Sequence, residues 1–143
     1  MGINSVAVVA DLGESYGNYT IGDDAALLGL VTASNIACGF HAGDPRVMDA
    51  TVRECVERGI ELGAHPGYPD LVGFGRRLIE ASEEEIRTDV LYQIGALDAF
   101  ARVHGGTISH VAPTAVWAAS PRRIPSTPAP LPTPWPPTTP PMW

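Results

Sequence analysis

Short apolar runs alternate along the chain with longer segments whose apolar residues recur at helical spacing, and this alternation limits the possible folds more than any other feature. The apolar runs lie at residues 5–10, 35–40, 60–64 and 107–111. Strands separated by helices of this length pair in parallel through right-handed crossovers. The sequence therefore predicts an α/β fold in the order β-α-β-α-β-α-β, which fits either a small open sheet or part of a (β/α) barrel.

Two of the helical segments carry clear start signals. Asp44 stands at a predicted N-cap with Pro45 at the first helical position, and Gly59 follows the last apolar residue of that segment. Proline fits the first position because its missing N–H would have no partner there. Ser82 and Glu85 form a predicted capping box ahead of the longest helix.

The charge distribution divides the chain. All 16 acidic residues lie within residues 1–112, together with 7 arginines, which leaves a net charge of 7 − 16 = −9 there. This charge argues against nucleic-acid binding, which needs a basic face. No apolar run approaches the roughly 18 residues of a membrane span, and the N-terminus has no basic segment of the secretory kind. Cys38 and Cys55 form no disulfide framework, so we expect small apolar packing roles and a reduced, cytoplasmic location.

The last part of the chain differs in kind. Eleven of the 14 prolines lie in residues 113–143, and they remove N–H donors that helices and sheets need. We therefore predict two regions: a folded domain at residues 1–112 and a Pro-rich tail at residues 113–143 that is polyproline-II-like or disordered.

Polar residues cluster where the predicted strands end. Because the carboxyl ends of parallel strands converge on the ligand site in α/β architectures, we expect these side chains to meet. One carboxylate with two histidines can hold a divalent metal ion, and the same groups suit general acid–base chemistry. The first three strands are followed by Asp11 and Glu14, by His41 and Asp44, and by His65 and Asp70.

Several of these residues also have a purely structural interpretation. Asp44 is explained completely by its N-cap position, and Asp70 follows a proline as turn residues often do. Arg76 and Arg77, in a glycine-rich stretch, could donate to a bound anion or be solvated loop residues. The role of His110, within the fourth strand, stays open.

Four stretches and a helix motif closely resemble the LamB/YcsF family, over about residues 6–112. The stretches are residues 10–17 (ADLGESYG), 35–45 (NIACGFHAGDP), 63–70 (GAHPGYPD) and 73–77 (GFGRR), with 92–97 (YQIGAL) in the long helix. The resemblance implies the N-terminal portion of a (β/α) barrel of the glycoside hydrolase/deacetylase type.

The resemblance also implies an activity: ATP-dependent opening of the 5-oxoproline lactam to glutamate, by the A subunit of a 5-oxoprolinase working with separate subunits B and C. A divalent metal is a further option. Carried over by position, the implied catalytic residues are Asp11, Glu14, His41 and His65, and the implied substrate- or anion-binding residues are Asp44, Asp70, Arg76 and Arg77. We expect His41 or His65 to act as acid or base and Asp11 to orient it or to bind metal.

The sequence departs from the family pattern in two places. Val9 stands where the family usually has asparagine, and the family's Lys-Pro-His-Gly motif is missing after residue 111. A one-base shift of a Pro-His-Gly coding sequence yields Pro-Thr-Ala, which occupies residues 113–115, so a frameshift would explain the tail. A complete barrel needs roughly 250 residues, so we expect this chain alone to be poorly folded, aggregation-prone or inactive.

Two other functions fit the residues. One is a metal-dependent amide or ester hydrolase of the polysaccharide-deacetylase type, with Asp11, His41 and His65 as ligands. The other is a non-catalytic fragment that docks to partner subunits or presents its tail to an SH3-like groove.

Overall fold

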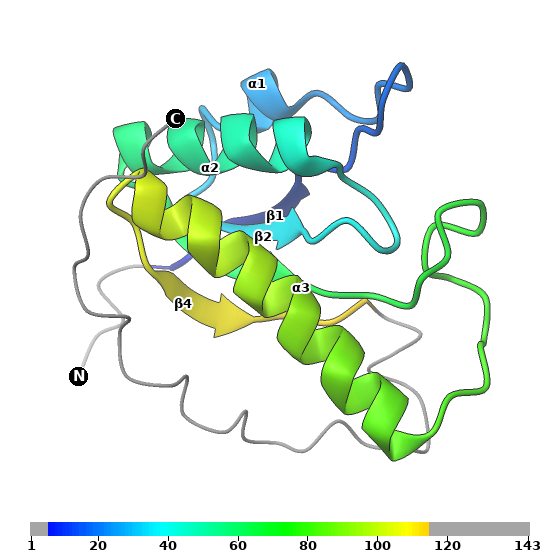
Figure 1. The fold of residues 1–143 in the computed structure, drawn as a ribbon. Helices are drawn as coiled ribbons and strands as arrows, with labels where there is room; N and C mark the ends of the chain where they lie inside the picture. Colours follow the sequence, from blue (N-terminus) through cyan, green and yellow to red (C-terminus); the bar gives the residue numbers. More distant parts are fainter. Residues whose placement is uncertain (1–5, 115–143) are drawn as a thin grey trace, which may run out of the picture.

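A computed structural model describes residues 6–114, and their elements follow the predicted order (Figure 1). Four parallel strands form one sheet in the order β1-β2-β3-β4. The strands are β1 (Val9–Leu12), β2 (Ala33–Ala37), β3 (Glu61–His65) and β4 (Ile108–Val111). The helices are α1 (Asp24–Leu27), α2 (Pro45–Arg58) and α3 (Glu83–Val103). The α/β expectation is confirmed, and the arrangement is that of a partial (β/α) barrel.

The sequence signals for α2 and α3 work as predicted. The Asp44 carboxylate accepts hydrogen bonds from the backbone N–H groups of Arg46 (2.8 Å) and Val47 (3.0 Å), which caps α2. Gly59 ends α2 in the left-handed conformation, with φ of 68°, which glycine adopts without steric cost. The Ser82–Glu85 capping box of α3 is present in both directions.

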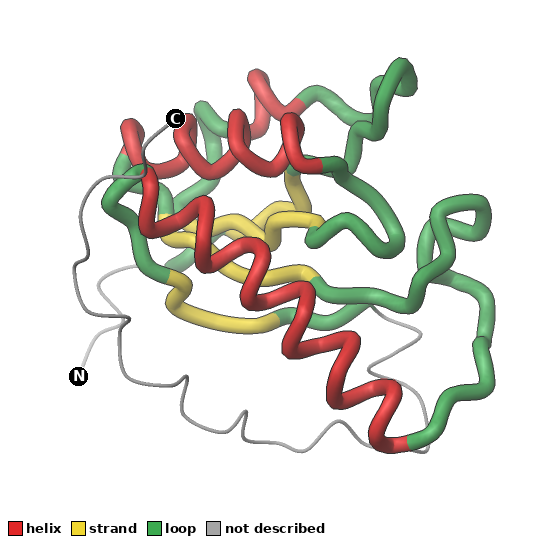
Figure 2. Tube along the Cα trace, in the orientation of Figure 1, coloured by secondary structure: helices red, strands yellow, loops and turns green. Residues whose placement is uncertain are grey.

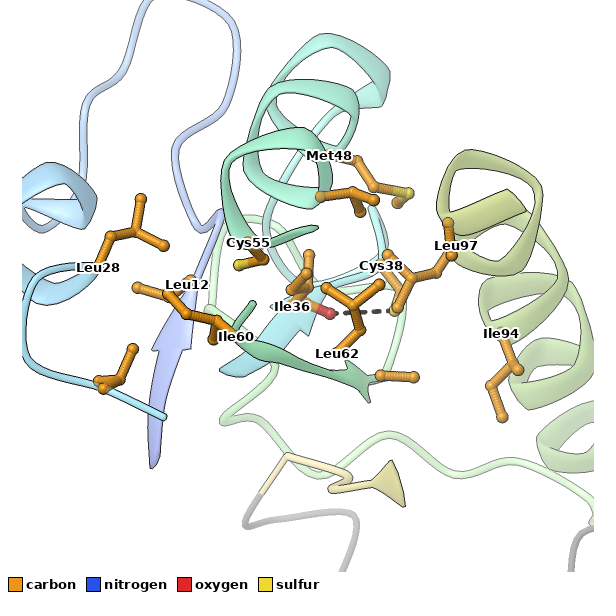
Figure 3. Close-up of a cluster of buried hydrophobic side chains, with 14 residues drawn as sticks. Leu12, Leu28, Ile36, Cys38, Met48, Cys55, Ile60, Leu62, Ile94 and Leu97 are labelled. Atoms are coloured by element: carbon orange, nitrogen blue, oxygen red, sulfur yellow. Dashed lines mark hydrogen bonds between the residues drawn. The ribbon is translucent and has the colours of Figure 1, made fainter. Parts of the chain in front are cut away.

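The main core lies between the sheet and the two long helices (Figure 3). Leu12, Ile36 and Leu62 point from the strands toward Cys55 of α2 and Leu97 of α3, and all five are buried. Both cysteines are free and buried, as predicted, and burial raises the pKa of the Cys38 thiol to about 12. The core therefore fastens α2 and α3 to one face of the sheet.

The strand boundaries differ from those predicted. β1 begins later than the predicted run at residues 5–10, and β2 ends before residues 38–40 of the predicted run at 35–40. Asp11 therefore lies within β1 and His65 is the last residue of β3, whereas we expected both to follow their strands. The reason is pairing: Asp11 lies opposite Asn35, and side-chain alternation turns its carboxylate away from the apolar core.

The loops after β1, β2 and β3 gather on one side of the sheet, at the carboxyl ends of these strands (Figure 2). Within residues 6–114, the outer edges of β1 and β4 pair with no further strand. The part of the chain that the structure describes contains no helix able to cross a membrane. Most of the predicted Pro-rich tail, and with it the frameshift and SH3-docking expectations, lies outside the described residues.

Candidate functional site

Four of the predicted site residues come together at the carboxyl ends of β1, β2 and β3. Asp11 projects from β1, Glu14 follows it, His41 lies in the loop after β2, and His65 ends β3. The rings of His41 and His65 meet edge to face, with centroids 5.0 Å apart. His65 Nε2 lies 3.7 Å from Asp11 Oδ2. Two imidazoles and two carboxylates thus share one small region, as acid–base chemistry requires.

His41 is a buried histidine whose polar atoms are unused. Its side chain is only 1% exposed, and neither ring nitrogen has a hydrogen-bond partner within residues 6–114. Burial, reinforced by the neighbouring His65, lowers the pKa of His41 to about 4, so the ring is neutral near pH 7. Buried polar groups normally have partners, so two unpartnered ring nitrogens mark His41 as a candidate ligand-binding residue.

Two glycines make room for the His41 ring. A Cβ added at Gly67 would lie 2.7 Å from His41 Nδ1, and one added at Gly75 would lie 2.8 Å from His41 Cβ. Thr114 lines the same wall, since its methyl group would meet a Cβ at either glycine, and its buried hydroxyl also has no partner among the described residues. Thr114 lies in the stretch where the sequence departs from the family, and sequence reasoning did not find it.

His65 has a defined proton position. Its Nδ1 faces the carbonyl oxygen of Ala112, and because a carbonyl only accepts, Nδ1 carries the hydrogen. The lone pair of a neutral ring then belongs to Nε2, on the side of Asp11. Asp11 in turn accepts a hydrogen bond of 2.9 Å from Asn35 Nδ2. The arrangement suits His65 as a base whose protonated form the Asp11 carboxylate would stabilise.

Glu14 is half-buried at the same place. Burial, and then the charge of Asp11, raise the pKa of the Glu14 carboxyl above its ordinary value. Ligand atoms of Glu14, His41 and His65 all lie within 4.8 Å of one another. This cluster could hold a cation, and its carboxylate is Glu14, whereas the sequence led us to expect Asp11 in that role.

The hydrogen bonds of Asp44 are made to the loop after β1 and to the start of α2, and not to this cluster. Besides capping α2, its Oδ2 accepts a hydrogen bond of 2.8 Å from the Gly17 N–H, which ties the loop after β1 to the start of α2. The Gly17 bond and the cap bonds lower the pKa of the Asp44 carboxyl. Both oxygens are therefore occupied within the chain.

Asp70 and Arg77 pair with each other. Asp70 is 2% exposed, and its carboxylate accepts from the Arg77 guanidinium and from the N–H of Gly73 (2.9 Å). The guanidinium bond, with the backbone bonds, lowers the pKa of Asp70 to about 2. Arg76 instead lies over the Phe74 ring, 5.5 Å from its centroid, and forms no ion pair within residues 6–114. Of the two arginines, Arg76 is the one left to meet an external anion.

Gln93 is a supporting residue that sequence reasoning also missed. Its buried amide accepts a hydrogen bond from the Gly67 N–H (3.0 Å) and donates one to the Gly67 carbonyl (3.0 Å). This pair of hydrogen bonds holds the loop after β3 against His41. The available signal was a polar residue inside the buried stripe of α3, between the apolar positions Val90 and Ile94.

The parallel sheet, with a cluster of acid–base groups at the carboxyl ends of its strands, places the chain among α/β proteins with part of a (β/α) barrel. The model of the LamB/YcsF family matches residues 6–119. The chain belongs to the LamB/YcsF family, which confirms the resemblance seen in the sequence.

Individual proteins agree with this assignment. The chain is 60% identical over 104 residues to the 5-oxoprolinase A subunit of Nocardia farcinica, covering 73% of this chain and 42% of that protein. It is 62% identical over 104 residues to the 5-oxoprolinase A subunit of Methylococcus capsulatus, covering 73% of this chain and 40% of that protein.

A solved structure is similar as well. The lactam utilization protein of Thermus thermophilus matches with a TM-score of 0.76 and 49% identity, covering 78% of this chain and 45% of that one. The chain therefore spans less than half the length of the relatives that it matches.

Proposed function

We propose that this chain supplies part of the lactam-opening site of an ATP-dependent 5-oxoprolinase, working with separate subunits B and C. The observation that carries the proposal is His41, a buried neutral imidazole with two unpartnered nitrogens beside His65. The names of the relatives, lactam utilization protein and 5-oxoprolinase A subunit, support a cyclic amide as substrate. Because the chain covers less than half of these relatives, the activity belongs to the proposal.

The chemistry divides between ATP and the side chains. A lactam carbonyl is a poor electrophile, and ATP would supply activation by placing phosphate on the carbonyl oxygen. Water then adds to the carbonyl carbon, the carbon–nitrogen bond breaks and the ring nitrogen takes a proton, which leaves glutamyl phosphate. A second water molecule hydrolyses this acyl phosphate to glutamate and phosphate, and ADP is the other product. In this proposal His65 Nε2 removes the proton from the first water molecule, and Asp11, 3.7 Å away, stabilises the imidazolium that forms.

His41 and Arg76 would bind the substrate. A histidine that is neutral at pH 7 can donate one hydrogen bond to an oxygen that gains negative charge, and such donors contribute most where water is excluded. Arg76 would meet the carboxylate of 5-oxoproline. The roles of Asp44, Asp70 and Arg77 as binding residues stay predictions. Each of these side chains already bonds within the chain, which leaves less of it to bind a substrate.

The test uses a chimera. Residues 6–112 of this chain replace the matched part of the Nocardia farcinica relative, and ATP-dependent glutamate formation is measured with that organism's subunits B and C. We expect activity that falls at least a hundredfold in His65→Gln, as for loss of an acid–base group, and in His41→Leu, as for loss of a donor to the developing negative charge. His104→Gln, outside the site, is the control. Full activity in both site variants would refute the proposal.

A second candidate function rests on the cluster of Glu14, His41 and His65. Two imidazole nitrogens and one carboxylate are a donor set that zinc accepts, and the unpartnered nitrogens of His41 fit this role. A bound zinc ion would polarise the amide carbonyl and lower the pKa of water. Stoichiometric zinc after dialysis, with amide hydrolysis that needs no ATP, would favour this metal-dependent hydrolase. Metal-free protein with ATP-dependent activity would exclude it.

A further inference from the structure

A row of polar residues crosses the sheet on the face opposite the apolar core. Asp11 of β1 lies opposite Asn35 of β2, Asn35 opposite Gly63 of β3, and Gly63 opposite His110 of β4. Their neighbours in the strands, such as Ile36 and Leu62, belong to the core under the helices. Alternation along β1, β2 and β3 therefore places this row on the other face, and the register shift between β3 and β4 brings His110 opposite Gly63. One residue from every strand takes part.

The row is joined by hydrogen bonds across the whole sheet. His110 Nε2 lies 3.0 Å from Asn35 Oδ1, and Asn35 Nδ2 donates to Asp11 Oδ1 at 2.9 Å. The His110 ring reaches Asn35 by passing over β3, which is possible because residue 63 is glycine. A Cβ added at Gly63 would lie 2.2 Å from His110 Nε2. The glycine is thus part of the connection.

The donors and acceptors from His110 through Asn35 to Asp11 can be assigned in only one way. The Asp11 carboxylate can only accept, so the Asn35 amide must turn its NH₂ group toward Asp11 and its oxygen toward His110. His110 must then carry a hydrogen on Nε2. Its Nδ1 lies 2.9 Å from Ser109 Oγ, whose single hydrogen can be donated either to this nitrogen or to the Leu62 carbonyl, 3.1 Å away.

The row ends at the candidate site. Asn35 occupies Asp11 Oδ1, and the other carboxylate oxygen, Oδ2, faces His65 Nε2 at 3.7 Å. The Asp11 side chain is 49% exposed, so without the Asn35 bond it could rotate toward water. Glu14, from the loop after β1, and His41, from the loop after β2, also face His65, but in the described part of the chain neither of them bonds to Asp11.

We infer that Asn35 and His110 are positioning residues that hold the Asp11 carboxylate against His65 across the width of the sheet. Neither would touch the substrate. Their effect on turnover rests on the proposed function, whereas their effect on Asp11 and His65 does not. Residues that orient a functional group through a hydrogen bond commonly contribute about ten- to a hundredfold to activity.

The experiment records ¹⁵N spectra of the full chain in metal-free buffer. We expect His110 to carry its hydrogen on Nε2 and His65 to carry its hydrogen on Nδ1. In His110→Leu, the resonances of the Asn35 side-chain amide and of the His65 ring should shift. In His110→Gln, whose amide can donate to Asn35, both should return toward their original values. His104→Gln is the control and should leave both unchanged.

Two further measurements keep the outcome decisive. If His110→Leu does not fold, Asn35→Ser replaces it, because a serine hydroxyl is too short to join His110 to Asp11, and the same His65 shift is expected. In the chimera, His110→Leu should lower kcat about tenfold or more with KM unchanged. Unchanged His65 resonances in folded His110→Leu or Asn35→Ser would overturn the inference. An inactive chimera would count against the proposed function alone, because the spectra need no substrate.

Discussion

At the scale of single residues, the decisive feature is the contrast between two neighbouring histidines. The His41 ring is buried without hydrogen-bond partners among the described residues, whereas the His65 ring is held in one orientation by its contacts. His41 loses its charge because the loop glycines and Phe74 enclose it. His65 keeps one nitrogen on a backbone carbonyl and turns the other toward carboxylates. Two histidines in contact thus have different chemical properties, because their surroundings differ.

The buried His41 predicts how stability depends on pH. Its pKa is about 4 in the folded chain against 6.5 ordinarily, so between these values the unfolded chain binds more protons. The stabilisation is complete above pH 6.5 and is lost as the pH falls to 4, a change on the order of 3 kcal/mol. Urea unfolding in metal-free buffer at several pH values measures it. His41→Leu should flatten the profile and His104→Gln should not; an unchanged slope in His41→Leu would contradict this assignment.

At the scale of elements, the boundaries of α2 and α3 could be predicted from sequence, and those of β3 and β4 to within one residue, whereas those of β1 and β2 could not. Asp44, Ser82 and Gly59 act within one turn of their helix, so local sequence is enough to find them. The ends of β1 and β2 depend on the neighbouring strand, which the sequence shows only indirectly. The apolar run beginning at Ser5 therefore suggested a strand that ends before Asp11, whereas pairing with β2 places Asp11 inside β1.

The same difference explains which site residues were found. Asp11, Glu14, His41 and His65 are recognisable because chemistry-bearing residues follow apolar runs. Asn35 and Gln93 look like ordinary polar residues until the fold brings Asn35 beside Asp11 and Gln93 beside Gly67. Their contacts join positions 24 and 26 residues apart, and no local pattern reports such pairs.

The N-cap of α2 allows a prediction that separates a structural role from a binding role. Asp44→Ala should cost about 1–2 kcal/mol of stability, because two N–H groups of α2 and one of Gly17 lose their acceptor. Asp44→Ser keeps an N-cap and should recover most of that loss in thermal unfolding. If Asp44→Ser restores stability while the chimera stays inactive, Asp44 also binds substrate, contrary to its occupied bonding in the structure.

Two glycines make a matched pair for testing the sheet. A Cβ at Gly63 would lie 2.5 Å from the backbone oxygen of Ser34, so Gly63→Ala should destabilise the chain by about 1–3 kcal/mol. Gly95, in α3, has no atom within 4 Å of an added Cβ, so Gly95→Ala should stabilise by about 0.5–1 kcal/mol. Chemical denaturation of both variants measures the difference. Equal effects at the two positions would contradict the close packing of Gly63 against Ser34.

At the scale of the whole molecule, the described residues form an open sheet. β1 and β4 are edge strands, and the polar row that would face a barrel interior lies on the side that α2 and α3 do not cover. The part of the chain that matches its relatives covers less than half of their length. An open parallel sheet with free edges is prone to pair with other chains.

We therefore predict self-association of the full chain. Its apparent mass by light scattering should rise with concentration, and Val111→Lys, which puts a charge on the exposed side of β4, should reduce that rise. Leu91→Lys, on the exposed side of α3, adds the same charge away from the edge and should have little effect. A chain that stays monomeric at every concentration would contradict this view of the free edges.

The most direct test of the central claim, that His41 and His65 form a lactam site, is a titration with 5-oxoproline. The chain has four histidines, so the ¹⁵N spectrum of the histidine-labelled full chain is simple enough to assign. We predict that the His41 and His65 resonances move and saturate as 5-oxoproline is added, while that of His104, bonded to Asp49 at the far end of α3, does not. Unmoved His41 and His65 resonances at saturating 5-oxoproline would contradict the account.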